Sequence, residues 1–179
     1  MSKHTKWDIW ISENVRYAMT KVPFVKASYS EYFFSRSEGN RIVEQGIVDI
    51  VGKHKPSDEL KDSVIVEIKG TNADINSGKG QNFIGKYNFF ATDEAFIDQL
   101  IRYRNNRYKD TGIGVLLVRK DGSVSTVIPS VNKGKELSIE SDFSEFETDD
   151  EVENYFRDVV IPQQKYWDSH KPYYRNICA

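Results

Sequence analysis

The sequence predicts a single α/β domain in which a mixed sheet is flanked by helices. Its 179 residues fit one domain and are enough to bury a hydrophobic core. An amphipathic helical segment comes first, three strand-like segments follow, and a second helical segment precedes further apolar strands. This order predicts a core of one helix, three strands, one helix and one strand, with an extra helix near the C-terminus.

The first helix is expected at about 8–20, before Pro23. Its buried face consists of Ile11, Val15, Ala18 and Val22, which recur at helical spacing. Aromatic and β-branched residues at 24–34 predict the first strand. A polar turn at 35–40 should lead into the second strand, 41–52.

A charged loop at 53–62 separates this strand from the third strand, 63–69. The next segment, 70–85, contains several glycines and little apolar periodicity. We expect a mobile loop or a short helix there.

The second half of the chain continues the alternation. A short strand is expected at 88–91, and Thr92 is the expected N-cap of the following helix. The buried stripe of that helix is Phe96, Ile97, Leu100 and Ile101. The apolar run 112–118 predicts a strand covered on both faces, and the Asp-Gly pair after it predicts a hairpin with 123–128.

An acidic segment, 140–153, leads into the last predicted helix. It holds eight Asp and Glu residues and no Lys or Arg, so the remainder of the chain is mildly basic. Thr148 and Glu151 form a capping box that should open this helix. Its inward residues are expected to be Val152, Tyr155, Phe156, Val159 and Val160. The segment is either a solvated surface or one that repels DNA or occupies a basic groove.

Two acids and a lysine are the most informative residues. Glu67 and Lys69 share one face of the third strand, because successive side chains of a strand point to opposite faces. A hairpin would bring Asp49 beside them. Buried charges are costly unless they pair or bind something, and two carboxylates suit Mg²⁺, which leaves positions for water and phosphate. The alternative is a structural ion-pair cluster.

Asp49, an intervening loop and the run Glu67-Ile68-Lys69 resemble the core signature of the PD-(D/E)xK nuclease superfamily. Val48 stands where that family often has proline. The similarity to the MmcB-like DNA repair proteins extends over IVEIKGTNAD (65–74), YNFFAT (87–92), GIGVLLV (112–118) and the Asp-Gly pair at 121–122. It covers the chain from about the first helix to the strand near Val127.

This resemblance implies a restriction-endonuclease-like fold and DNA hydrolysis that depends on Mg²⁺ or Mn²⁺. Asp49, Glu67 and the backbone carbonyl of Ile68 would hold the metal, and Lys69 would orient water or contact the phosphate. Two more acids are candidates for this site. Asp74 matches an acid just after the signature, and Glu13 corresponds to the helix acids of some members.

Five basic residues are candidates for contacting DNA. Lys79 and Lys86 belong to the glycine-rich segment, and Arg102, Arg104 and Arg107 form a basic helix end interleaved with tyrosines. Cations at a helix C-terminus also stabilise the helix by themselves, which is the alternative explanation for the arginines.

The preferred function is a metal-dependent deoxyribonuclease in repair, recombination or phage DNA processing, acting alone, as a homodimer or with a protein partner. The alternatives are a catalytically silent nucleic-acid-binding or partner-binding protein on the same fold, and a structural or inhibitory protein. No apolar run approaches the ~20 residues needed to cross a bilayer, and no secretory leader is visible. Cys178 is the single cysteine, so a reducing cytoplasm is the expected compartment.

Overall fold

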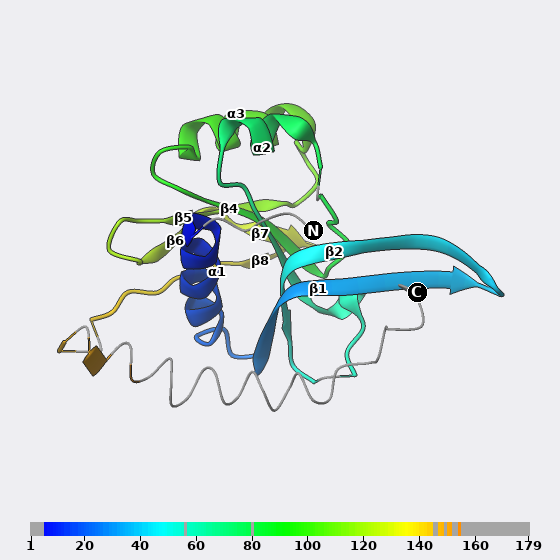
Figure 1. The fold of residues 1–179 in the computed structure, drawn as a ribbon, viewed down its shortest axis with the longest axis horizontal. Coiled ribbons are helices and arrows are strands. Elements are labelled where there is room, and N and C mark those ends of the chain that lie inside the picture. Colours follow the sequence, from blue (N-terminus) through cyan, green and yellow to red (C-terminus); the bar gives the residue numbers. More distant parts are fainter. Residues whose placement is uncertain are drawn as a thin grey trace.

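A six-stranded mixed sheet forms the centre of the computed structural model, with its strands in sequence order. The structure describes residues 6–55, 57–79, 81–144, 147–148, 150–151 and 154. Helix α1 (Lys6–Met19) covers one face of the sheet, and α2 (Asn72–Ser77) and α3 (Ile97–Arg107) cover the other (Figure 1). The expected α/β class, with a mixed sheet flanked by helices, is confirmed.

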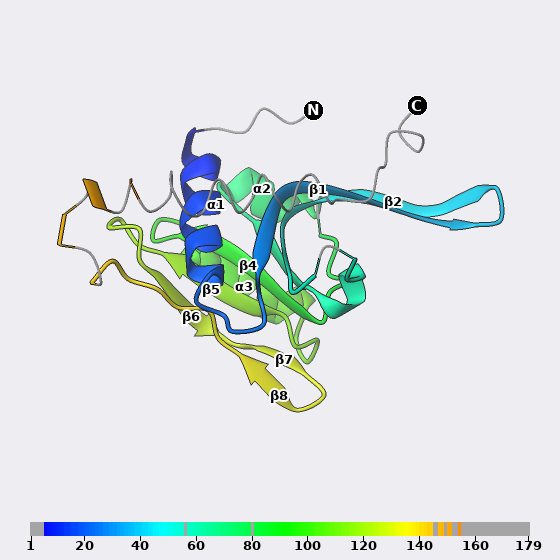
Figure 2. The same cartoon turned by 90° about the horizontal axis from the view of Figure 1, so that it is seen from below.

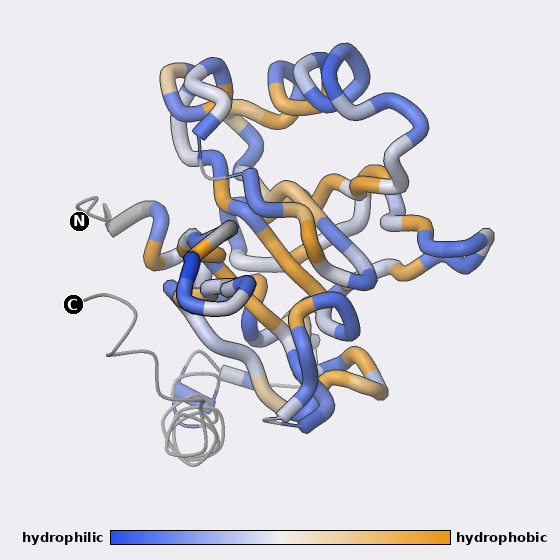
Figure 3. Tube along the Cα trace, turned by 90° about the vertical axis from the view of Figure 1, so that its right-hand side faces the viewer, coloured by the Kyte–Doolittle hydropathy of each residue, from blue (hydrophilic) through white to orange (hydrophobic). Residues whose placement is uncertain are grey.

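The predicted stripe of the first helix faces the sheet. Ile11, Val15 and Ala18 are buried in one cluster with Val66 and Phe89 of the central strands. Apolar residues are accordingly concentrated in the strands at the centre of the molecule, with hydrophilic segments around them (Figure 3). Burial of this cluster is the main hydrophobic contribution to the fold on this face.

Strands β1 (Ala27–Glu38) and β2 (Arg41–Lys53) form a long antiparallel hairpin. Its distal half projects away from the rest of the molecule in two perpendicular views (Figures 1 and 2). The predicted polar turn at 35–40 is too long, because residues as far as Glu38 remain paired with β2. Gly39 allows the tight turn, since its φ of 61° lies in the left-handed region that favours glycine.

The short 3₁₀ helix η1 (Leu60–Asp62) precedes β3 (Val64–Ile68), which pairs antiparallel with β2. Strand β3 then pairs parallel with β4 (Tyr87–Asp93), and β4 pairs parallel with β5 (Gly114–Val118). Strand β6 (Val124–Ile128) closes the sheet as the antiparallel partner of β5. The predicted strands are therefore present, with ends displaced by a few residues.

The predicted role of Thr92 as a helix N-cap is wrong. Thr92 is fully buried inside β4, where it pairs with Leu117, and its hydroxyl donates to the backbone carbonyl of Lys69. Because pairing holds the chain extended as far as Asp93, α3 begins only at Ile97. The expected apolar stripe of α3 still packs inward, with Leu100 buried and Phe96, Ile97 and Ile101 against the same cluster.

A small hairpin of β7 (Ser130–Asn132) and β8 (Lys135–Leu137) was not predicted. It lies beside β4, where the Ser130 hydroxyl accepts the Asn88 N–H at 3.0 Å. Both strands contain three residues, too few to show a period of two.

The predicted capping box is present. The Thr148 hydroxyl accepts the Glu151 N–H at 3.3 Å, and the Glu151 carboxylate accepts the Thr148 N–H at 3.4 Å. The inward residues predicted for the last helix lie outside the described residues. None of the helices in the described part of the chain combines the length and apolar character needed to span a bilayer.

Candidate functional site

The site begins where the ladder between β2 and β3 ends. The last paired residues are Ile50 and Val66, and the next residue of β2 is Asp49. Its carboxylate accepts the N–H of Ile68 at 2.7 Å, so it replaces a main-chain acceptor of the ladder. This hydrogen bond brings Asp49 to the Glu67-Ile68 peptide.

Asp49 and Glu67 form a carboxyl pair where the ladder between the two strands ends. Glu67 is only 1% exposed. Burial, the charge of Asp49 and the hydrogen bond between the two carboxyl groups together raise the pKa of Glu67 from 4.5 to about 10, and the Asn82 N–H and Lys69 oppose this shift. Without a bound divalent cation, Glu67 is therefore protonated at neutral pH.

Lys69 comes directly after β3, two residues from Glu67 along the extended chain, and is 2% exposed. Its ammonium donates to the backbone carbonyl of Lys79 at 2.7 Å and to the Asp74 carboxylate at 3.4 Å. The other oxygen of Asp74 accepts the Gly70 N–H at 3.2 Å. Asp74 therefore lies beside Lys69 and orients both Lys69 and the chain that follows it. Its predicted role in placing metal or DNA stays a prediction.

The segment after α2 contributes two residues that the sequence reasoning missed, Gln81 and Asn82. The Asn82 N–H donates to Glu67 at 3.4 Å, and its side-chain amide donates to the Ile47 carbonyl at 3.1 Å. The Gln81 amide donates to the Tyr103 hydroxyl at 2.9 Å. These partners are 15, 35 and 22 residues away in sequence, so no local pattern could have indicated them.

The acid of α1 that approaches this end of the sheet is Asp8 rather than Glu13. Glu13 is exposed, off the buried face of the helix. Asp8 lies against Gly70, where an added Cβ would collide with its carboxylate. A sequence signal for Asp8 existed, because it precedes Ile11 by three residues and so extends the apolar stripe by one turn.

The two lysines of the glycine-rich segment lie at different ends of the sheet. Lys79 contributes its carbonyl to the site, and its side chain is exposed. Lys86 lies at the start of β4, where its N–H donates to the Ser63 carbonyl at 2.8 Å. Because β3 and β4 are parallel, the connection between them runs back along the sheet and carries Lys86 away from Glu67.

The three arginines of α3 differ in their surroundings. Arg104 donates to the Ile113 carbonyl at 2.8 Å and so ties the end of the helix to the entrance of β5. Arg107 lies over the Tyr103 ring, 5.8 Å from its centre, and Arg102 is exposed. Arg102 and Arg107 present their charge on the surface, whereas Arg104 has a structural contact.

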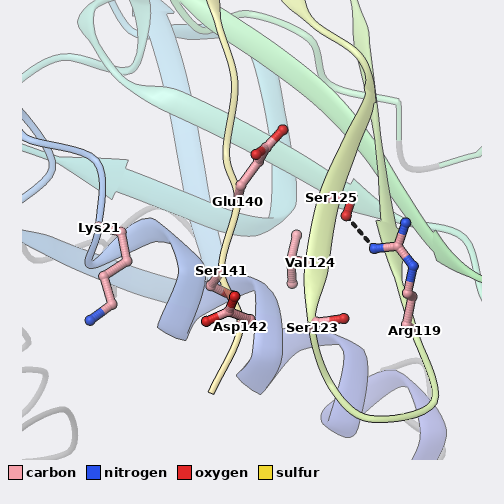
Figure 4. A pocket seen from close by; sticks show the side chains of 8 residues that line it. All are labelled: Lys21, Arg119, Ser123, Val124, Ser125, Glu140, Ser141 and Asp142. Carbon is pink, nitrogen blue, oxygen red and sulfur yellow. Dashed lines mark hydrogen bonds between the residues drawn. The ribbon is translucent and has the colours of Figure 1, made fainter. Parts of the chain in front are cut away.

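A separate polar hollow lies beside the C-terminal end of α1 (Figure 4). Its lining residues are Lys21, Arg119, Ser123, Val124, Ser125, Glu140, Ser141 and Asp142. Two cations and two acids line it, so it has no net charge to select an ionic ligand. None of its residues belongs to the pair of Asp49 and Glu67.

No family model, curated protein or solved structure matches the chain. Over the described residues, no group of three or more His, Cys, Asp and Glu side chains converges. The candidate site thus consists of two carboxyl groups and a lysine, and membership of the PD-(D/E)xK superfamily stays a prediction.

Proposed function

We propose that this protein is a metal-dependent deoxyribonuclease whose site consists of Asp49, Glu67 and Lys69. The observation that carries the proposal is the carboxyl pair at the end of the ladder between β2 and β3, with Lys69 beside it. The order of one helix, three strands, one helix and one strand, with antiparallel, antiparallel and parallel pairing, supports a restriction-endonuclease-like core.

The carboxyl pair fits a small divalent cation. Burial and the charge of Asp49 raise the pKa of Glu67, so the pair holds a proton that a bound cation would displace. Hard oxygen donors are the ligands that Mg²⁺ and Mn²⁺ prefer, and the carbonyl of Ile68 is the proposed third donor. When bound, such an ion would lower the pKa of a water ligand and neutralise charge on the phosphate.

Lys69 would contact the scissile phosphate or orient the attacking water. Its ammonium is held by the Lys79 carbonyl and Asp74, so its position is set before substrate arrives. The exposed residues Lys79, after α2, and Arg102 and Arg107, on α3, would contact the DNA backbone. The expected substrates are branched, single-stranded or flap DNA.

A second candidate function is a catalytically silent DNA-binding or partner-binding protein on the same fold. The near-complete burial of Glu67 and Lys69 favours it, because a phosphodiester must reach both groups for cleavage. The two candidates differ in divalent-cation binding, which the silent protein does not require.

Cleavage of fluorescent flap, branched and single-stranded DNA in Mg²⁺ or Mn²⁺ tests the proposal. Lys69→Met should lower the cleavage rate by at least about 100-fold, the usual size of a lost electrostatic contact in catalysis. Lys61→Met is the matched control, because Lys61 is exposed, pairs with Glu59 and lies before β3.

Equal cleavage by wild type and Lys69→Met would identify a contaminating nuclease. Absence of cleavage, combined with no Mn²⁺ binding by wild type in calorimetry, would favour the silent protein. Mn²⁺ binding that is lost in Asp49→Ala would support the metal site independently of any DNA substrate.

A further inference from the structure

Residues 79, 81 and 82 contact the site and two surrounding elements at once. The Lys79 carbonyl holds Lys69, and the Asn82 N–H reaches Glu67. The side chain of Asn82 is anchored to β2, and that of Gln81 is anchored to α3. The groups that touch the site are thus backbone groups, whereas the anchoring groups are side chains.

Gln81 has the firmest anchorage of the three. Its amide donates to the Tyr103 hydroxyl at 2.9 Å, and its carbonyl oxygen accepts the hydroxyl of Tyr108. Both tyrosine rings pack edge-on against Phe90, whose side chain is fully buried in the sheet. Gln81 therefore links the segment to the core rather than to a mobile surface.

Asn82 supplies the second anchor, on the other side of the site. Its side-chain amide donates to the Ile47 carbonyl of β2, two residues before Asp49. With α3 holding residue 81 and β2 holding residue 82, the backbone groups that meet Lys69 and Glu67 have little freedom to move. Neither anchor touches the reacting groups by its side chain.

We propose that Gln81 and Asn82 are positioning residues, which hold the Lys79 carbonyl against the Lys69 ammonium and the Asn82 N–H against Glu67. This inference rests on the proposed function for its catalytic consequence, but the positions it concerns can be measured without any reaction. Loss of either side-chain anchor should loosen Lys69 while leaving the hydrophobic core intact.

Proton exchange of the lysine ammonium groups, measured by ¹⁵N NMR, tests the proposal. Exposed ammonium groups exchange with water quickly, whereas buried, hydrogen-bonded ones are protected. Lys69 has a natural internal control in Lys53, which is also 2% exposed and donates to the Tyr32 hydroxyl at 3.0 Å and the Asp58 carbonyl at 2.8 Å. The Lys69 signal is assigned by its loss in Lys69→Met.

In Asn82→Ala the Lys69 ammonium should exchange about fivefold faster, the factor expected when one neutral hydrogen bond no longer restrains opening. In Gln81→Met, which removes the hydrogen bonds to both tyrosines, the acceleration should be at least as large. The Lys53 signal should be unchanged. The double variant Tyr103→Phe/Tyr108→Phe should accelerate Lys69 proton exchange as much as Gln81→Met does. The triple variant that combines all three substitutions should exchange no faster than Gln81→Met alone.

Unchanged Lys69 exchange in both single variants would overturn the proposal, and so would equal acceleration of Lys53, which would indicate general destabilisation.

With an active wild-type enzyme, Gln81→Met should lower kcat and leave KM within about twofold, since the effect lies in the reacting groups. If Lys69 exchange responds as expected but the wild type cleaves no DNA, the positioning role stands and the nuclease proposal fails.

Discussion

Glu67→Gln should make the protein more stable at neutral pH when no divalent cation is present. Burial and the neighbouring Asp49 raise the pKa of Glu67 from 4.5 to about 10. Between these values the folded protein holds a proton that the unfolded chain has released, so the free energy of unfolding falls as pH rises above 4.5 and levels off above about 10. A neutral glutamine carries no such dependence.

The size of the effect follows from the same pKa. Proton uptake costs about 1.36 kcal/mol for each pH unit above the ordinary pKa, or about 4 kcal/mol at pH 7.5. The amide of the substituted side chain can still donate to Asp49, as the protonated carboxyl does. The expected stabilisation is therefore about 2 to 4 kcal/mol at pH 7.5, and it should shrink toward zero near pH 4.5.

Urea unfolding followed by circular dichroism at pH 5, 7.5 and 9 in EDTA measures this difference. Glu13→Gln is the control, because Glu13 is exposed on α1, and its effect should stay within about 0.5 kcal/mol. A Glu67→Gln variant that is less stable than wild type at pH 7.5 and 9 would refute the reasoning, since it would mean that Glu67 is ionised and favourably paired in the folded protein.

The same pair of proteins tests the metal site. Mn²⁺ at 100 times its Kd should stabilise the wild type by about 2.7 kcal/mol, because a ligand that binds only the folded state shifts unfolding by mass action. Glu67→Gln should lose most of this gain. Equal stabilisation of both proteins by Mn²⁺ would mean that Glu67 is not a ligand.

Three further substitutions, in strands β4 and β5, test by urea unfolding the packing and hydrogen bonds of the sheet that carries the site. Thr92→Val should cost about 1 to 3 kcal/mol, because the Lys69 carbonyl loses its buried hydroxyl donor, and unchanged stability would mean that another donor replaces it. Phe89→Ala should cost about 3 to 5 kcal/mol, because a fully buried ring is removed between β4 and α1, and a cost below about 1 kcal/mol would contradict this packing. Gly114→Ala should cost about 1 to 3 kcal/mol, because the new Cβ would lie 2.6 Å from the Ile128 carbonyl, and full stability would show that the two strands can separate there.

Local pattern was sufficient for most of the sheet and its helices. The stripe of α1 followed from helical spacing, and β3 and β5 followed from short apolar runs bounded by polar or glycine-containing segments. Local pattern also predicted that Glu67 and Lys69 share one face, because successive side chains of an extended backbone point to opposite sides. The capping box at Thr148 was equally local.

Local sequence pattern predicted the wrong structure at positions where pairing with a neighbouring strand determines the conformation. Thr92 has the composition of a helix cap, but pairing with β5 and the carbonyl of Lys69 keep it in β4. The same effect lengthened β1 through Glu38. Cross-strand hydrogen bonds connect residues far apart in sequence, so a window of neighbouring residues does not contain them.

Local sequence pattern indicated the two acids and the lysine of the site, but strand pairing and chain path set which residues meet there. Asp49 reaches Ile68 because the β2 and β3 ladder ends one residue earlier. Lys86 is carried to the far end of the sheet by the parallel pairing of β3 and β4, although it belongs to the same loop as Lys79. Gln81 reaches Tyr103 of α3 because the loop after α2 passes beside that helix. Periodicity in the sequence indicates which face of an element a side chain lies on, but it does not indicate which distant residue lies next to that face.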